Sequence, residues 1–400
     1  MSTAASSNAA ASTGSASLPV PATGFAEFDE TLATVPLVDH HAHGALLASP
    51  TAAEFEGFIN EGLPGIPPAA MTPWDSQLGF AIRRWCAPLL GAEPSADPEA
   101  YWAARSALPE QEVSRRLLTV AGVSDWLIDT GFSEYVLEPA QMAAIAGRAY
   151  EIVRLETLAE RVITAIGSGG DYAAALTTRL REATAQAVGV KSVLAYRGGF
   201  DIDLSRPADT DVATAAQRWL DGLADGRPPR LVDVTLLRFG LHAALERGLP
   251  VQFHVGFGDR DTDLRRGNPL HLRDYLFAAE AADVPVMLLH NYPFEREAGY
   301  LAQAFRTVYI DAGLAINYSG ARSPAVIART LELAPFGKVL YSGDAWGPAE
   351  LHYLGSLLWR RGMAAVIGPW LHAGEWTERD AVRITTMMAR TNALRAYGLD

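Results

Sequence analysis

Strand-like and helix-like segments alternate along this chain, and this alternation restricts its fold more than any other feature. We predict strands at 36–43, 126–131, 150–156, 189–197, 250–257, 284–291, 307–313 and 338–344. Segments with apolar residues at helical spacing separate most of them, including a long helix over about 157–187. This repeated pattern predicts an α/β protein with a (β/α)8 TIM barrel. A doubly wound open sheet is the alternative, but it favours a glycine-rich loop after the first strand, where this chain has "HHAHG".

The 400 residues suffice for one large barrel domain, which we place at 25–400. Few strand signals occur between about 45 and 125, so we expect a helical insertion after the first strand. Residues 1–24 are rich in Ala, Ser and Thr, with no basic start and no long apolar core. We therefore predict a disordered tail there rather than a signal peptide.

The composition of the chain restricts the classes of partner that it can bind. The formal net charge of −13 at pH 7 argues against nucleic acid and anionic membranes, because binding to both depends on Lys and Arg. No apolar run approaches the roughly 18 residues of a membrane helix. Cys86 is the single cysteine, so no internal disulfide can form, which fits the cytoplasm. We expect a small-molecule substrate and a cytoplasmic location, and the sequence leaves homo-oligomer formation open.

Histidines and charged residues gather near the ends of the predicted strands. They are His41 and His43 on the first strand, Lys191 and Arg197 on the fourth, His254 on the fifth, His290 on the sixth and Asp344 on the eighth. Active sites of such barrels lie at the carboxyl ends of the strands, so these side chains should converge. Neutral imidazoles and a carboxylate are ligands that suit Zn²⁺. The sequence therefore predicts a metal site.

The stretch "VDHHAH" holds three of the nine histidines, and strand alternation divides them. Successive side chains of a strand point to opposite faces. Asp39, His41 and His43 should therefore share the barrel face, whereas His40 should face the surrounding helices. We expect a structural role for His40.

In this order, "HAH", "FHVG", "LLH" and "SGDAWG" resemble the amidohydrolase superfamily. The stretch from "FHVGFGD" to "SGDAWGPAELHYLG" resembles a narrower branch, the amidohydrolase-related proteins found alone in bacteria and fused to a glutamine-synthetase-like domain in fungi and plants. The resemblance spans roughly 30–400 and implies a distorted (β/α)8 barrel with a metal-activated water.

Carried over residue by residue, the resemblance implies that His41, His43 and Asp344 hold one metal ion. In binuclear members the positions of His254 and His290 bind a second ion, and a carboxylated lysine at the position of Lys191 bridges the two. In mononuclear members the position of His254 binds the single ion, and that of His290 contacts substrate or water. Lys191 lies early in its predicted strand, so a salt bridge or substrate contact is an equal alternative for it.

We expect a hydrolase that cleaves a C–N bond with one or two Zn²⁺ ions, and with Asp344 and His290 as catalytic residues. Arg197 is the candidate to bind a substrate carboxylate, and His271 and Asp259 lie in the loop after the fifth strand. Two alternatives stay open. One is a metal-dependent decarboxylase of an aromatic or unsaturated acid, typically mononuclear. The other is a non-catalytic barrel scaffold, which predicts eroded ligands.

Overall fold

Seven parallel strands form one curled sheet in the computed structural model, which describes residues 18–61 and 72–399. The strands pair in sequence order, each with the next. They are β1 (Leu37–Ala42), β2 (Val123–Asp129), β3 (Arg148–Arg154), β4 (Gly189–Ser192), β5 (Val251–Val255), β6 (Val286–His290) and β7 (Val308–Ile310). Their order and direction are those of the predicted TIM barrel.

The eighth predicted strand, 338–344, closes the barrel without forming a regular strand. Leu340 donates its N–H to the carbonyl of Ile310 on β7 at 2.9 Å, and Tyr341 accepts from the N–H of His40 on β1 at 3.2 Å. The ladder is interrupted where the N–H of Gly343 donates to a side chain, the carboxylate of Asp39, at 2.9 Å. It resumes where Asp344 donates its N–H to the His41 carbonyl at 3.0 Å. The segment thus bridges β7 and β1 as an extended chain.

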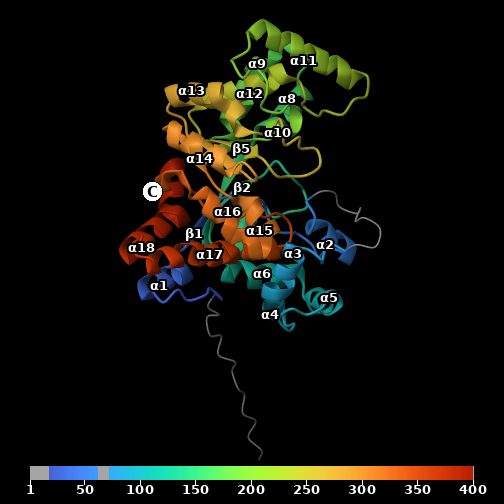
Figure 1. Ribbon diagram of the computed structural model, residues 1–400. Helices are drawn as coiled ribbons and strands as arrows, with labels where there is room; N and C mark the ends of the chain where they lie inside the picture. The colour runs from blue at the N-terminus through green and yellow to red at the C-terminus, as the bar shows by residue number, and fades with distance from the viewer. Residues whose placement is uncertain (1–17, 62–71, 400) are drawn as a thin grey trace, which may run out of the picture.

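Helices separate the strands and cover the outside of the barrel (Figure 1). Between β1 and β2 the described helices are α2 (Ala52–Phe58), α3 (Gln77–Ala81), α4 (Ala87–Leu90), α5 (Pro98–Ser106) and α6 (Glu110–Val120). Later ones are α7 (Pro139–Ile145), α8 (Leu155–Ile163), α9 (Tyr172–Ala183), α10 (Leu194–Arg197), α11 (Asp209–Ala224), α12 (Val234–Arg247), α13 (Arg273–Ala281), α14 (Glu295–Ala304), α15 (Gly313–Ser319) and α16 (Ser323–Thr330). Helix α1 (Ala26–Thr34) precedes β1, and α17 (Ala349–His372), α18 (Glu378–Thr386) and α19 (Asn392–Tyr397) end the chain.

One helix prediction and one strand prediction need correction. The helix predicted over 157–187 is broken into α8 and α9, because Gly169 packs so closely on α11 that a Cβ would lie 2.4 Å from a backbone oxygen. The fourth strand ends at Ser192, well before the predicted 197. The carboxylate of Glu156 accepts from the Ser192 hydroxyl at 2.7 Å and from the Val193 N–H at 3.0 Å, and the chain turns there into α10.

The predicted disordered tail does not extend through residue 24. Thr23 donates its N–H to Asp29 at 2.8 Å, and its carbonyl lies 2.9 Å from Nε2 of His372 on α17. Leu18 and Val20 pack against the core. Residues 1–17 of that prediction lie outside the described residues.

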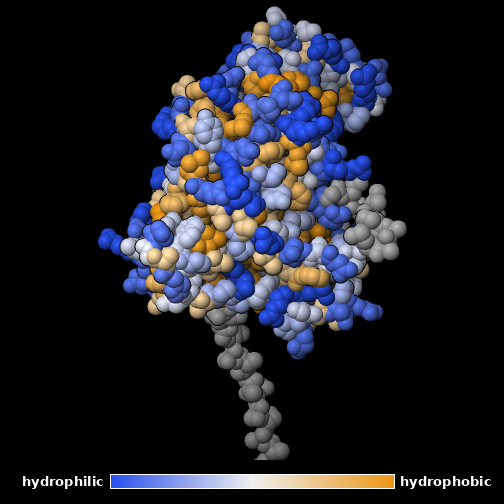
Figure 2. All heavy atoms as spheres, in the orientation of Figure 1, coloured by the Kyte–Doolittle hydropathy of each residue, from blue (hydrophilic) through white to orange (hydrophobic). Residues whose placement is uncertain are grey.

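Hydrophilic residues cover much of the face in Figure 2, with smaller apolar areas between them. This is the ordinary surface of a protein that buries its core. Within residues 18–61 and 72–399, no helix is both long enough and apolar enough to cross a membrane.

The C-terminal helix α19 fills one end of the barrel interior. Leu394 and Tyr397 pack against inward-facing strand residues that include Val38, Ile152 and Met287. These residues lie toward the amino ends of their strands, below the predicted site. The Tyr397 hydroxyl accepts from Nε2 of the Gln252 amide at 2.7 Å and lies 3.1 Å from His40 Nδ1. Helix α19, which we call the plug, is therefore hydrogen-bonded to the polar residues Gln252 and His40 above it.

Replacing Tyr397 by Phe should lower the free energy of unfolding by about 1–3 kcal/mol, because it leaves buried polar groups of Gln252 and His40 without a partner. Urea unfolding followed by circular dichroism measures the change. Tyr300→Phe is the control, since Tyr300 is 53% exposed on α14. Equal stability of the two variants would contradict the bonded plug.

Candidate active site

The pairing of β1 with β2 is irregular at the histidine-rich stretch. Between Asp39 and Ala42, β1 takes three steps where β2 takes two. An extra residue of this kind interrupts strict alternation. His40 consequently points into the barrel, where its Nε2 lies 2.8 Å from Oδ2 of Asp311. The prediction that His40 faces the surrounding helices is wrong, although its structural role remains.

Asp39 lies on the other side of this strand. Its carboxylate accepts from the Gly343 N–H and lies near Tyr341, whose ring packs on Trp359 of α17 at 5.4 Å. Burial raises the pKa of Asp39 well above its usual value. The prediction that Asp39 shares the barrel face with His41 is therefore also wrong, and the same irregularity in β1 is the reason.

Three predicted ligands converge on one point. His41 Nε2 lies 3.0 Å and His43 Nε2 lies 3.6 Å from Oδ1 of Asp344. One ligand atom from each residue falls within a common distance of 4.8 Å, and all three residues are buried. Two imidazoles and a carboxylate at this spacing fit a Zn²⁺-type ion.

The hydrogen bonds of the two histidines leave their Nε2 atoms available as ligands. The Gln252 amide donates through Nε2 to the His40 carbonyl at 2.8 Å, so its Oε1 is left to accept from His41 Nδ1 at 2.8 Å. His43 Nδ1 lies 3.2 Å from the carbonyl of Asp129, which can only accept. In both rings the proton sits on Nδ1, and the lone pair of Nε2 faces Asp344.

Burial also keeps these groups in the protonation state that metal binding needs. It lowers the pKa of His41 to about 4, with a further contribution from the nearby charge of Lys191. Burial alone would raise the pKa of Asp344, but the imidazoles of His290, His41 and His43 hold it well below its usual value. At neutral pH the site therefore offers the neutral imidazole of His41 and the ionised carboxylate of Asp344.

His290 reaches the site through an unusual backbone conformation. Its φ of 69° lies in the left-handed region, as does that of Asp344 at 44°, and such values are strained for residues other than glycine. Nε2 of His290 lies 3.2 Å from Oδ2 of Asp344. The geometry of this contact is not that of a hydrogen bond, and neither ring nitrogen has a hydrogen-bond partner among the described residues. A buried imidazole in this state is open to a ligand.

Lys191 and His254 are also at the site, with different surroundings. Lys191 Nζ lies 3.1 Å from His41 Nε2, and burial lowers the pKa of Lys191 to about 8. His254 Nε2 lies 2.9 Å from the Tyr196 hydroxyl and 3.1 Å from the carbonyl of Phe257. Because that carbonyl only accepts, His254 Nε2 carries a proton here, and the ring is not part of the three-residue cluster.

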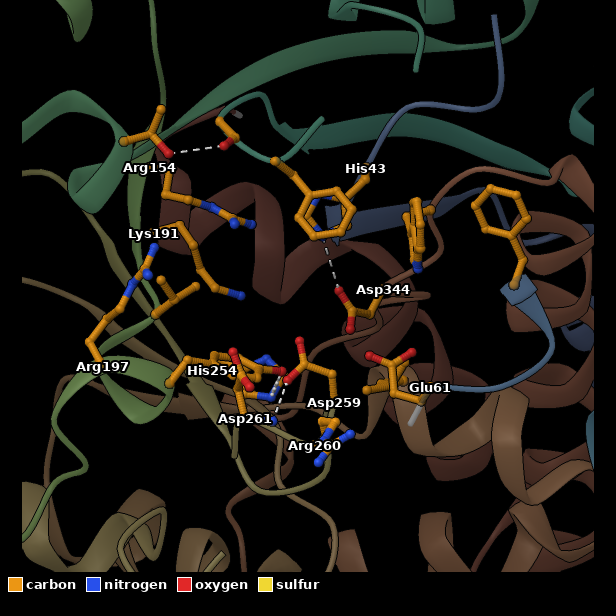
Figure 3. Close-up of a pocket in the computed structure, with 18 of the residues that line it drawn as sticks. His43, Glu61, Arg154, Lys191, Arg197, His254, Asp259, Arg260, Asp261 and Asp344 are labelled. Atoms are coloured by element: carbon orange, nitrogen blue, oxygen red, sulfur yellow. Dashed lines mark hydrogen bonds and ion pairs between the residues drawn. The ribbon is translucent and has the colours of Figure 1, made fainter. Parts of the chain in front are cut away.

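A cavity of about 530 Å³ opens over these residues. Figure 3 shows Arg154, Lys191 and Arg197 on one side of it, with Asp344 and Glu61 across from them. Burial raises the pKa of Glu61 to about 8, and the charge of Asp344 adds to the effect. The cavity therefore has a cationic side that faces the predicted metal ligands.

Arg197 is held on this cationic side by α10 rather than by a strand. Its Nη2 lies 3.4 Å from Glu160, whereas its buried Nε and Nη1 have no hydrogen-bond partner in the part of the chain that the structure describes. Unpaired N–H groups of a buried guanidinium are suited to a carboxylate. Asp259 also lines the cavity. His271 is exposed at the start of α13 and is not among the described lining residues.

Sequence reasoning did not anticipate several residues that shape the site. They are Gln252, Asp129, Tyr397, Tyr196 and Glu61. A polar Gln within the apolar strand "VQFHV" was the one available signal, since a buried amide needs partners.

The sequence of this chain is similar to those of known proteins. The profile of the family described as Amidohydrolase matches residues 137–399. The protein fluG of Emericella nidulans is 26% identical over 404 residues, covering 92% of this chain and 46% of fluG. The chain therefore spans about half the length of that relative.

Solved structures give the same result for the fold. A Lactobacillus casei protein, provisionally classed as a metal-dependent hydrolase, matches with a TM-score of 0.82 and 26% identity over 93% of this chain and 97% of that one. A uronate isomerase from Bacillus halodurans matches with a TM-score of 0.61 and 15% identity over 95% and 97%, a likeness in fold alone.

His41→Ala and His43→Ala should each lose bound metal, because each removes one of three converging ligands. His40→Gln should keep most of it, because His40 bonds to Asp311 and Tyr397 outside the cluster. Metal per chain after dialysis, measured by plasma mass spectrometry, checks this. Equal loss from all three variants would show that β1 is placed in the wrong register.

Gln252→Met should weaken metal binding about 10- to 100-fold, because it removes the acceptor that fixes the proton on His41 Nδ1. Competition with a chromophoric chelator measures the affinity. Gln217→Met, an exposed change on α11, is the control. An unchanged affinity in Gln252→Met would contradict the role assigned to the amide.

Proposed function

Because this chain belongs to the amidohydrolase family, we propose that it is a metal-dependent hydrolase that cleaves the C–N bond of a small, carboxylate-bearing amide. The convergence of His41 Nε2, His43 Nε2 and Asp344 carries the proposal. Zn²⁺ is the proposed ion, since two imidazoles and a carboxylate suit it, and we keep both one and two ions open. The cytoplasm is the proposed location.

A divalent ion held by His41, His43 and Asp344 would lower the pKa of water toward about 7 and would polarise the carbonyl under attack. In the reaction, water adds to the carbonyl carbon and the C–N bond breaks. The acyl part leaves as a carboxylate and the amine takes up a proton. The protein must therefore move one proton from water to the departing nitrogen.

Asp344 is placed to move that proton. Its Oδ1 faces His41 and His43, while its Oδ2 faces His290. Oδ2 takes the proton from the attacking water and delivers it to the amine nitrogen, which is general base followed by general acid catalysis. His290 has both ring nitrogens unpaired and lies against Oδ2, so it orients the water or the substrate carbonyl.

The substrate is proposed to bind through Arg197. Its Nε and Nη1 are buried and unpaired within the described chain, and they lie on the cavity side opposite Asp344 (Figure 3). A carboxylate there can accept from either of these N–H groups, which lie on different edges of the guanidinium. The volume of about 530 Å³ suits a small molecule.

Lys191 bears on the number of metal ions. Its Nζ lies 3.1 Å from His41 Nε2, so a carboxylated Lys191 reaches the same point as the other ligands. The alternative function is decarboxylation at a single ion. The separation of His254 from the three-residue cluster does not favour it, because the position of His254 is expected to bind that ion in mononuclear members. Metal analysis and a screen of N-acyl amino acids, γ-glutamyl amides and aromatic acids distinguish the two.

Asp344→Asn should lower kcat at least about 100-fold, because the amide cannot accept the proton. Since Asp344 is also a ligand, His290→Gln is measured beside it and should lower kcat while the metal content stays near that of the wild type. Asp211→Asn, an exposed change on α11, is the control. Near-normal turnover of an amide by Asp344→Asn would overturn the assignment.

A further inference from the structure

Three aromatic rings form one wall of the cavity, and the proposed reaction does not use them. The ring centroids of Phe58 and Trp346 lie 4.6 Å apart, with an angle of 65° between the ring planes. Those of Phe132 and Trp346 lie 4.9 Å apart, with an angle of 78°. Phe132 also packs on His43, with ring centroids 4.6 Å apart. All three residues line the cavity, so the wall reaches from a proposed metal ligand to α2.

These rings are not ordinary core. Phe132 is 40% exposed, and Phe58 and Trp346 are half-buried. The backbone makes room for the wall at Gly347, whose φ is 76° and where a Cβ would lie 2.7 Å from the Phe58 ring. Only glycine adopts this conformation readily and leaves the ring its place. The glycine thus leaves room for the half-buried ring of Phe58 beside the site.

The position of the wall relative to Arg197 sets the orientation of a bound amide. Trp346 follows Asp344 by two residues, and Phe58 precedes Glu61 by three residues. Figure 3 shows Asp344 and Glu61 across the cavity from Arg197. An acyl group anchored by its carboxylate at Arg197 therefore directs the amine part of the amide toward Asp344 and the rings.

We propose that Phe58, Phe132 and Trp346 form a subsite for an aromatic group on the amine side of the scissile bond. Resting on the proposed function, this makes the substrate an amide that joins a carboxylate-bearing acyl group to an alkylamine with an aromatic substituent. A substrate ring can pack on these three rings in offset or edge-to-face contact. Each such contact stabilises the complex beyond the burial of apolar area alone.

The test uses the metal-loaded full chain and matched amides of succinate and glutarate. Each acid is coupled to benzylamine, methylamine or ethylenediamine. The benzylamides should show kcat/KM about 10- to 100-fold above the methylamides, the range expected of two aromatic contacts. A preference for the ethylenediamine amides would assign this wall to a cation, and equal rates for the benzyl and methyl amides would leave no aromatic subsite. Either result overturns the proposal.

Binding of ketone analogues separates the subsite from the reaction. In these a methylene group replaces the amide N–H, so the wild-type protein binds them without hydrolysis, and calorimetry gives Kd. The benzyl ketone should bind about 10-fold or more tightly than the methyl ketone. If this holds while no amide is cleaved, the subsite stands and hydrolysis fails. If amides are cleaved without a benzyl preference in either assay, hydrolysis stands and the subsite fails.

Substitutions in the aromatic wall test whether the benzyl preference arises there. Trp346→Leu and Phe58→Leu should each remove most of the benzyl preference while leaving the methylamide rate and the metal content near those of the wild type. Phe277→Leu, which changes an exposed ring on α13 outside the cavity, is the matched control. A full benzyl preference in both cavity variants, with the metal bound, would show that the ring binds elsewhere.

Discussion

The carboxamide of Gln252 connects β1, β5 and the last helix in one set of buried hydrogen bonds. Its oxygen accepts from His41 Nδ1, and its nitrogen donates to the His40 carbonyl and the Tyr397 hydroxyl. With both N–H groups used, the amide cannot turn over without leaving buried polar groups unpaired. Its orientation therefore fixes the tautomer of His41, and that tautomer decides whether Nε2 can act as a ligand. The centre of the site thus depends on a residue that would not touch the metal.

The barrel interior is layered along its axis. Apolar side chains and α19 fill the end toward the amino termini of the strands. Above them lies a polar layer in which Asp311 accepts from the His290 N–H at 2.7 Å and pairs with His40. The metal ligands and the cavity come next. Because packed side chains fill the layers below, the His41 imidazole is fully buried, and its lowered pKa follows from this position. The plug therefore serves the chemistry as well as stability.

The sequence was a better guide to which residues come together than to the directions of their side chains. Parallel strands bring their carboxyl ends to one edge, so His41, His43 and Asp344 had to approach one another. The irregularity in β1 leaves no compositional mark, and alternation therefore misplaced Asp39 and His40. The early end of β4 depends on the distant carboxylate of Glu156, which no local pattern reveals. His271, a candidate to contact the substrate, is not among the described residues that line the cavity, and spacing along a loop does not fix the path of the chain.

The two sides of the cavity exclude each other's ligands, and this restricts the orientation of a substrate. A carboxylate placed against the faces of Phe58 and Trp346 exchanges its water for apolar surface. An aromatic ring placed at Arg197 leaves the buried Nε and Nη1 of that guanidinium without a partner. The amide bond between the two groups is then held beside Asp344, which converts binding energy into orientation for attack. Hydrolysis leaves a protonated amine against ring faces, and these attract a cation. The wall that positions the neutral substrate therefore also tolerates the charged product at the moment the C–N bond breaks.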